Sequence, residues 1–174
     1  VTNSQYVNYL NEKKYTPVEV SQYIGIRGYS IRPTQIAYTG NRYRASLGYE
    51  QHPVATVNYD GASSYCRWLG GRLPTEFEWE VAARGGVEDW NYTWGNSQSN
   101  EHANVAKKWP LQGIMPTQPV RSYPANEFGL YDMIGNVGEW TSSLYTPYPG
   151  STEAIFHSDR KTRFVVKGGD WFST

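Results

Sequence analysis

The chain has 174 residues, a length that suits one domain, so residues 1–174 are expected to share one hydrophobic core. Its 16 lysines and arginines balance its 16 aspartates and glutamates, which excludes the strong long-range field of a protein that binds nucleic acid or anionic membranes. No run of about 18 apolar residues is present, so no transmembrane segment is expected, and the single cysteine excludes an intrachain disulfide and a multi-cysteine zinc site.

The first predicted element is a short helix at the start of the chain. Thr2 and Gln5 form a capping-box pattern, in which each side chain bonds the other residue's backbone N–H. Three apolar residues then share one face at helical spacing, namely Tyr6, Tyr9 and Leu10. We expect this helix to end near Glu12, and strands to follow at residues 36–38 and 43–45.

Two further helices are predicted in succession. Asn58 can cap the first of them, and the glycines at 70–71 end it. Its apolar face comprises Ala62, Tyr65, Cys66 and Leu69. Thr75 and Glu78 form a second capping box, and the helix they open lasts about ten residues, until the glycines at 85–86. Its apolar positions are Phe77, Val81 and Ala82.

The chain after residue 86 has the composition of irregular structure. It is rich in Gly, Pro, Asn, Ser and aromatic residues, and only residues 119–120 and 163–167 have strand patterns, the second of them typical of a buried strand. A region of about 90 residues with so little regular structure needs another organiser. Because a disulfide is excluded, a metal ion or a dense network of aromatic contacts and hydrogen bonds is expected there.

Five sequence blocks carry a family resemblance, in the family's order. They are residues 52–70 (HPVATVNYDGASSYCRWLG), 71–86 (GRLPTEFEWEVAARGG), 92–96 (YTWGN), 128–140 (FGLYDMIGNVGEW) and 165–171 (VVKGGDW). With them the chain resembles the formylglycine-generating-enzyme-like, or sulfatase-modifying-factor, superfamily over residues 1–174. The resemblance implies an α+β, C-type-lectin-like fold with two to three short helices, a small twisted antiparallel sheet and long ordered loops. It also implies that the family's N- and C-terminal ends lie outside this chain.

The segment from Asp132 to Glu139 has the residues of a calcium loop. Its two carboxylates flank Gly135 and Gly138, which let the backbone turn. Calcium takes six to eight oxygen ligands in flexible geometry, and carboxylates mixed with backbone carbonyls suit it. The alternative from the residues alone is that Asp132 caps a turn and Glu139 pairs with an arginine.

The resemblance implies a definite set of calcium ligands in this loop. Carried over by position, they are Asp132, Gly135, Val137 and Glu139. A weaker second site maps to Asn104, Val105, Gln112 and Ile114. There a neutral amide, Gln112, stands where the family has a carboxylate. We expect calcium to be structural, not catalytic.

The family's copper site is expected to be missing. The enzymes of this family oxidise a substrate cysteine with oxygen, using a copper ion held by two cysteine thiolates. The first of these positions is Ser173 here, and a hydroxyl does not hold cuprous ion as soft sulfur does. Copper is therefore not expected, and no catalytic residue is assigned. Cys66 lies on a predicted helix face and is interpreted as a packing residue, while His52, His102 and His157 lack ligand spacing.

Two functions follow from these patterns. The first is a non-catalytic, calcium-stabilised binding or structural module, an accessory domain or subunit of a larger extracytoplasmic assembly, periplasmic or at the cell surface. Its partner would be a protein or a glycan, which the ring-rich segments 23–49 and 90–109 would bind. The alternative for those rings is that they fill the core. The alternative is a copper-dependent formylglycine-generating-type oxidase, or a related iron-dependent sulfoxide synthase, whose metal site is completed outside this chain.

Overall fold

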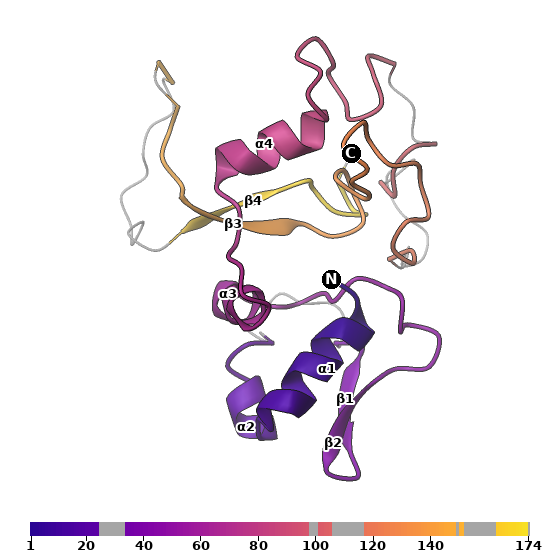
Figure 1. Cartoon of the computed structure of the whole chain (residues 1–174), viewed down its shortest axis with the longest axis vertical. Helices are drawn as coiled ribbons and strands as arrows, with labels where there is room; N and C mark the ends of the chain where they lie inside the picture. The colour runs from indigo at the N-terminus through magenta and orange to yellow at the C-terminus, as the bar shows by residue number, and fades with distance from the viewer. Residues whose placement is uncertain (25–33, 98–100, 106–116, 149, 152–162, 174) are drawn as a thin grey trace.

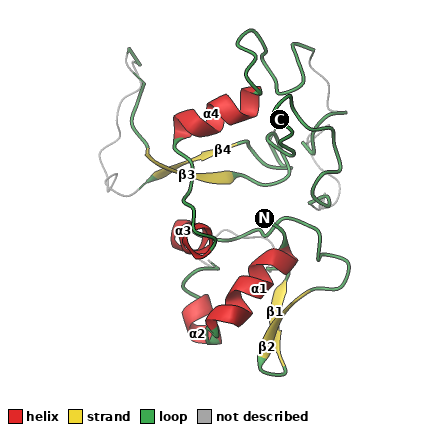
Figure 2. Ribbon diagram, viewed as in Figure 1, coloured by secondary structure: helices red, strands yellow, loops and turns green. Residues whose placement is uncertain are grey.

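The computed structural model describes residues 1–24, 34–97, 101–105, 117–148, 150–151 and 163–173 (Figure 1). Its elements in chain order are α1 (Asn3–Lys13), α2 (Pro17–Val20), β1 (Ile36–Thr39), β2 (Arg42–Ala45), α3 (Tyr59–Trp68), α4 (Glu76–Arg84), β3 (Glu139–Leu144) and β4 (Phe164–Lys167). The strands form two antiparallel pairs, β1 with β2 and β3 with β4. The predicted α+β class, with short helices, small antiparallel sheets and long loops, is confirmed (Figure 2).

The elements divide into two regions along the chain. The N-terminal region, residues 1–71, holds α1, α2, α3 and the β1–β2 hairpin, while the C-terminal region, residues 72–173, holds α4, the β3–β4 pair and most of the long loops (Figure 1). The regions meet where Trp140 Nε1 donates to the Val57 carbonyl at 2.9 Å and where the Tyr59 and Phe164 rings stack at 3.5 Å. The C-terminal loops are thereby anchored to the helical region.

The predicted helix starts are correct because capping is a local interaction. Thr2 and Gln5 exchange their side-chain to backbone bonds at 2.8 and 3.2 Å, and the Asn58 side chain accepts from the Gly61 N–H at 2.9 Å. Thr75 forms the third cap, with Gly85 in the left-handed conformation at the helix end. The sequence prediction missed the one-turn helix α2, although Thr16 and Glu19 form the same capping pattern there.

The predicted apolar face of α4 was wrong. Phe77 and Val81 are 72% and 60% exposed, and the helix buries Trp79 and Ala83 instead. The reason is tertiary: α4 lies along the β3–β4 pair, and that contact takes the face with the largest ring (Figure 1). On α3, Tyr65 is buried as expected, whereas Cys66 is half-buried and Leu69 is 62% exposed.

The strand predictions were partly correct. The segments 36–38, 43–45 and 163–167 correspond to β1, β2 and β4, although β4 is half-buried and not fully buried. Residues 119–120 form no strand; Val120 instead donates its N–H to the Gln51 carbonyl at 2.9 Å. Strand β3 was missed because its sequence, EWTSSL, is largely polar, and its one buried side chain is Thr141.

The main core lies in the N-terminal region and is built from rings. Tyr6, Tyr9 and Leu10 are at most 1% exposed, and Tyr65 stacks on Tyr6 with 5.5 Å between ring centroids. The rest of this cluster consists of Val7, Val20, Ile24, Ile36 and Tyr43. Large aromatic side chains therefore supply the core that the composition predicts.

Candidate functional site

The loop from Asp132 to Glu139 turns sharply through left-handed backbone. Asp132, Gly135 and Asn136 have φ angles of 57°, 77° and 63°. A Cβ at Gly135 would lie 2.5 Å from the Asn104 carbonyl oxygen, so only glycine allows this close approach. The loop is therefore pressed against the segment that carries the second predicted site.

Asn136 ties this loop to three other segments. Its side-chain oxygen accepts from the Gln118 N–H at 3.0 Å and from Asn104 Nδ2 at 3.2 Å, and its Nδ2 donates to the Gln118 carbonyl at 3.2 Å. Its own N–H donates to the Asn104 carbonyl, and its carbonyl accepts from the Trp171 N–H. We call these four residues the Asn136 network. Asn136 itself is 2% exposed, so nearly all of its polar atoms are satisfied inside the protein.

The two carboxylates of the loop have different environments. Asp132 Oδ2 accepts from the backbone N–H of Arg121, 11 residues earlier in the chain, at 2.8 Å. Glu139, the first residue of β3, accepts a hydrogen bond from the Trp79 indole N–H and from no arginine among the described residues. Both carboxylates line an open cavity of about 910 Å³, together with Val137.

Partial burial affects the ionisation of Glu139. It raises the pKa of the Glu139 carboxyl above its ordinary value, and the nearby charge of Asp132 acts in the same direction. The hydrogen bond from Trp79 and the amino group of Val1 oppose these effects. The ionised form of Glu139 is therefore less favoured than that of an exposed glutamate.

The two carboxylates are oxygen donors of the kind that a divalent cation prefers. The salt bridges of the described residues all lie elsewhere, joining Arg72 to Glu78, Arg84 to Glu80, and Lys167 to Glu76 and Glu80. Asp132 and Glu139 therefore face one cavity without a lysine or arginine partner within the described part of the chain. Oxygen donors of this kind suit calcium, and Gly135 and Val137 would add backbone carbonyls.

The second predicted calcium site is described only in part. Asn104 is 3% exposed, and its amide donates to Asn136, so it belongs to the Asn136 network. Val105 follows it and is half-buried. Gln112 and Ile114 lie outside the described residues.

The position expected for the first copper thiolate is a structured turn. The Asp170 N–H donates to Ser173 Oγ at 3.0 Å, and Ser173 Oγ donates to Asp170 Oδ1 at 3.1 Å. The Ser173 N–H also donates to the Asp170 carbonyl at 3.0 Å. Ser173 is exposed, and its hydroxyl acts as a turn-closing group.

Within the described residues, the remaining sulfur and imidazole groups assemble no metal centre. Cys66 is a half-buried free thiol whose pKa is raised by burial, so it is less readily ionised than an exposed cysteine. His52 contacts the Thr117 hydroxyl at 2.9 Å and His102 stacks on Trp94, while His157 lies outside the described residues. No three His, Cys, Asp or Glu side chains in the described ranges are placed to hold a metal together.

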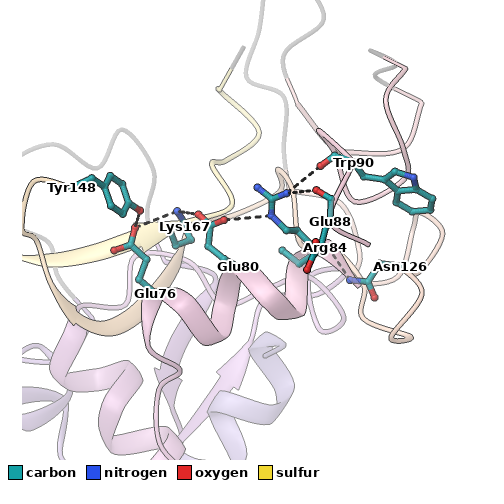
Figure 3. Close-up of polar contacts among 9 residues, drawn as sticks. Glu76, Glu80, Arg84, Glu88, Trp90, Asn126, Tyr148 and Lys167 are labelled. Carbon is teal, nitrogen blue, oxygen red and sulfur yellow. Dashed lines mark hydrogen bonds and ion pairs between the residues drawn. The ribbon is translucent and has the colours of Figure 1, made fainter. Parts of the chain in front are cut away.

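A polar network joins one side of α4 to β4. Lys167 Nζ lies 2.5 Å from Glu80 and 3.4 Å from Glu76, and the Tyr148 hydroxyl also bonds Glu76 (Figure 3). Glu80 reaches Arg84 at 3.8 Å, an ion pair at the i, i+4 spacing of a helix. This network fastens the helix to β4 and to the loop that carries Tyr148.

The ring-rich segments divide between core and surface. Tyr43 is buried in the core, whereas Tyr38, packed against it at 4.9 Å, is 42% exposed. Tyr92 and Trp94 stack with 5.2 Å between centroids and are half-buried, and Trp109 lies outside the described residues.

Among the described residues, no helix is both long and apolar enough to cross a membrane.

Two residues of the site were not identified from the sequence. Trp79 bonds Glu139 of the loop, and Asn136, within the loop, bonds Gln118, but neither is a predicted ligand. Both stand inside the family blocks, and Asn136 falls between two glycines in a left-handed position that favours asparagine. The glycines around Asn136 could have indicated a turn. They could not have indicated the distant residues that Trp79 and Asn136 bond.

Comparison with known proteins gives a consistent family result. The profile of the sulfatase-modifying factor enzyme 1-like domain matches residues 1–174. The chain is 39% identical over 132 residues to the formylglycine-generating enzyme of Mus musculus, covering 69% of this chain and 35% of that protein. It is 38% identical over 147 residues to the inactive C-alpha-formylglycine-generating enzyme 2 of Bos taurus, covering 80% of this chain and 44% of that protein. It is also 40% identical over 147 residues to the serine/threonine-protein kinase pkn1 of Chlamydia caviae, covering 83% and 22%.

Solved structures show the same fold. CarF covers 100% of this chain and 73% of its own with a TM-score of 0.61, and PvdO from Pseudomonas aeruginosa covers 100% and 67% with a TM-score of 0.64. Both are 24% identical, so the likeness concerns the fold alone. The chain spans only about a fifth to under a half of the length of the three relatives named above.

Proposed function

Because the chain belongs to the family of sulfatase-modifying factor enzyme 1-like domains, we propose that it is a non-catalytic, calcium-stabilised member. Family membership alone does not decide catalysis, since relatives named as active and as inactive are similar to it at 39% and 38% identity. The observation that carries the proposal is the Ser173 hydroxyl, which closes a turn with Asp170 where the resemblance places a copper thiolate. A neutral oxygen in that position is a poor ligand for cuprous ion.

Calcium supplies the stabilising part of the proposal. When bound, the ion would neutralise Asp132 and Glu139, with Gly135 and Val137 adding backbone oxygens. The protein's own residues prepare this loop: Gly135 allows its close approach to residue 104, and Asn136 satisfies the polar groups behind it. A cation in this position would order a region with few buried apolar side chains.

The wider role we propose is that of an accessory domain or subunit of an extracytoplasmic assembly, with a protein or a glycan as its partner. Supporting this role is the number of large apolar side chains that the C-terminal region leaves exposed, among them Phe77, Phe128, Tyr148 and Phe172. Aromatic side chains supply contact area at low entropic cost.

Oxygen consumption tests the absence of catalysis. Copper-loaded full-length protein is mixed with a cysteine-containing peptide, beside a formylglycine-generating enzyme as the positive control. We expect no oxygen uptake above the rate of copper alone and no peptide aldehyde by mass spectrometry. Turnover would overturn the proposal and favour the oxidase whose metal site is completed outside this chain.

Calcium binding is tested separately. We expect isothermal titration calorimetry of the metal-free protein to detect calcium, and Glu139→Gln to weaken the binding because it removes a charged ligand. A chelator should lower the melting temperature of wild type. An unchanged melting temperature, with no metal by elemental analysis, would contradict the structural role of calcium.

A further inference from the structure

Glu139 and Lys167 are direct cross-strand partners, yet they do not pair. Strands β3 and β4 are antiparallel, with Glu139 opposite Lys167 in their register. Side chains directly opposite each other project from the same face of a sheet with Cβ atoms about 5 Å apart, and opposite charges there normally attract. Lys167 instead bonds Glu80 at 2.5 Å and Glu76 at 3.4 Å (Figure 3). Glu139 accepts a hydrogen bond from the indole of Trp79.

Trp79 contacts both of these charged groups. Its N–H donates to Glu139, and Lys167 Nζ lies 5.9 Å from its ring centroid, within the range of a cation–π contact. The ring is 8% exposed and packs closely against the end of β4. A Cβ at Gly168 would lie 3.3 Å from Trp79 Cζ2 and 3.2 Å from the Met133 carbonyl, at a φ of 83° that itself favours glycine.

The two glutamates of α4 complete the arrangement. Glu76 and Glu80 are one helical turn apart on the same face, so both reach Lys167 from above the sheet. The ammonium thus has two carboxylates on the helix side, while the indole that it approaches donates its N–H to the third, Glu139.

We propose that Trp79, together with Glu76 and Glu80, reserves the Glu139 carboxylate for a divalent cation by keeping the Lys167 ammonium away from it. This inference rests on the proposed calcium loop and deepens it, because it assigns a specificity role to residues that are not ligands. A lysine bound to Glu139 would compete with calcium for the same oxygens. Trp79 is therefore a positioning residue: it donates to one carboxylate oxygen and blocks the neighbouring cation.

Calcium titration of the full-length protein tests the role of the indole as a barrier. In Trp79→Ala the barrier is gone, and we expect Kd for calcium to rise about tenfold or more, the usual scale for residues that support a metal ligand. Adding Lys167→Met to Trp79→Ala should recover most of the lost affinity, because the competing charge is removed while its aliphatic stem remains. Lys167→Met alone should change Kd by less than about twofold, a small effect beside the tenfold or greater rise expected for a lost supporting residue.

The rescue separates positioning from general destabilisation. A merely structural role of Trp79 would leave the double variant as weak as Trp79→Ala, and that result would overturn the inference. Trp68→Phe is the matched control, since it removes another indole-to-carboxylate bond, from Trp68 Nε1 to Glu12 at 3.1 Å, outside the calcium loop. It should leave Kd unchanged.

A second pair of variants covers the case in which Trp79→Ala does not fold. Replacing Glu76 and Glu80 by glutamine removes the competing partners of Lys167 with the indole still present. We expect weaker calcium binding, again restored by Lys167→Met, and an unaltered Kd in the glutamine variant would refute the inference. If wild type itself binds no calcium, the proposed calcium function fails together with the inference. If wild type binds calcium and the variants do not change Kd, only the inference fails.

Discussion

The two regions of this protein are held together by different forces. In the N-terminal region, Tyr6, Tyr9 and Leu10 are buried among other rings, and their packing is largely non-directional. In the C-terminal region, the most deeply buried side chains include Asn104, Asn136 and Thr141, each bonded to other segments. Packing tolerates small shifts of neighbouring groups, whereas a buried hydrogen bond depends on one partner at one position.

The difference explains where a metal ion would act. The rings of the N-terminal region bury apolar surface against one another. The loop between Asp132 and Glu139 instead combines left-handed backbone, a half-buried carboxylate and a network centred on one asparagine. Stability in that region should therefore depend more strongly on ligands and on single polar groups.

The largest expected effect is in the aromatic core. Leu10→Ala should lower the free energy of unfolding by about 3 kcal/mol, because Leu10 is fully buried and a cavity would remain. Urea denaturation measures the change. Leu47→Ala is the control, since Leu47 is 93% exposed and its loss should cost less than about 0.5 kcal/mol. Equal effects of the two variants would contradict a core in this region.

Removing calcium should destabilise the C-terminal region more than the N-terminal region. A calcium concentration about 100 times Kd would stabilise the protein by about 2.7 kcal/mol, and a chelator would abolish that gain. Hydrogen exchange should then speed up mainly at residues 132–141 and 164–171, with little change in α1 and α3. Uniform acceleration over both regions would show that they do not differ in their dependence on the ion.

Replacing Asn136 by alanine tests how much the Asn136 network stabilises the C-terminal region in the absence of calcium. Asn136→Ala should cost about 2 kcal/mol, because groups of Asn104 and Gln118 lose their buried partner and the residue is held at positive φ. Denaturation in chelator measures this cost. Asn96→Ala, which removes one exposed bond to the Asn91 N–H, is the matched control and should cost clearly less.

The smallest effect concerns the cap of α4. The Arg72 side chain and the Thr75 N–H lower the pKa of Glu78 to about 2. Since this pKa lies below that of the unfolded chain, the contribution of Glu78 is present above about pH 4.5 and is lost as the pH falls towards 2. Glu78→Gln should therefore flatten the acid side of a melting curve plotted against pH. The change should be slight and weaker in high salt, because both side chains are solvent-exposed.

Much of the fold was predictable from short-range patterns. The caps at Thr2, Asn58 and Thr75 depend on residues within one turn, so the sequence alone located three helices. The five family blocks indicated the fold, and they placed Asp132 and Glu139 in one loop before any contact was known.

Tertiary structure alone decided which surfaces and partners these elements meet. The pattern of α4 favoured a face with Phe77 and Val81, but packing against β3 and β4 selected the face with Trp79. Likewise, the bond from Trp79 to Glu139 joins residues 60 positions apart, and no spacing within either block predicts it. Local sequence determined where helices begin because caps are satisfied within a few residues, whereas burial and the surroundings of a charge are set by distant segments.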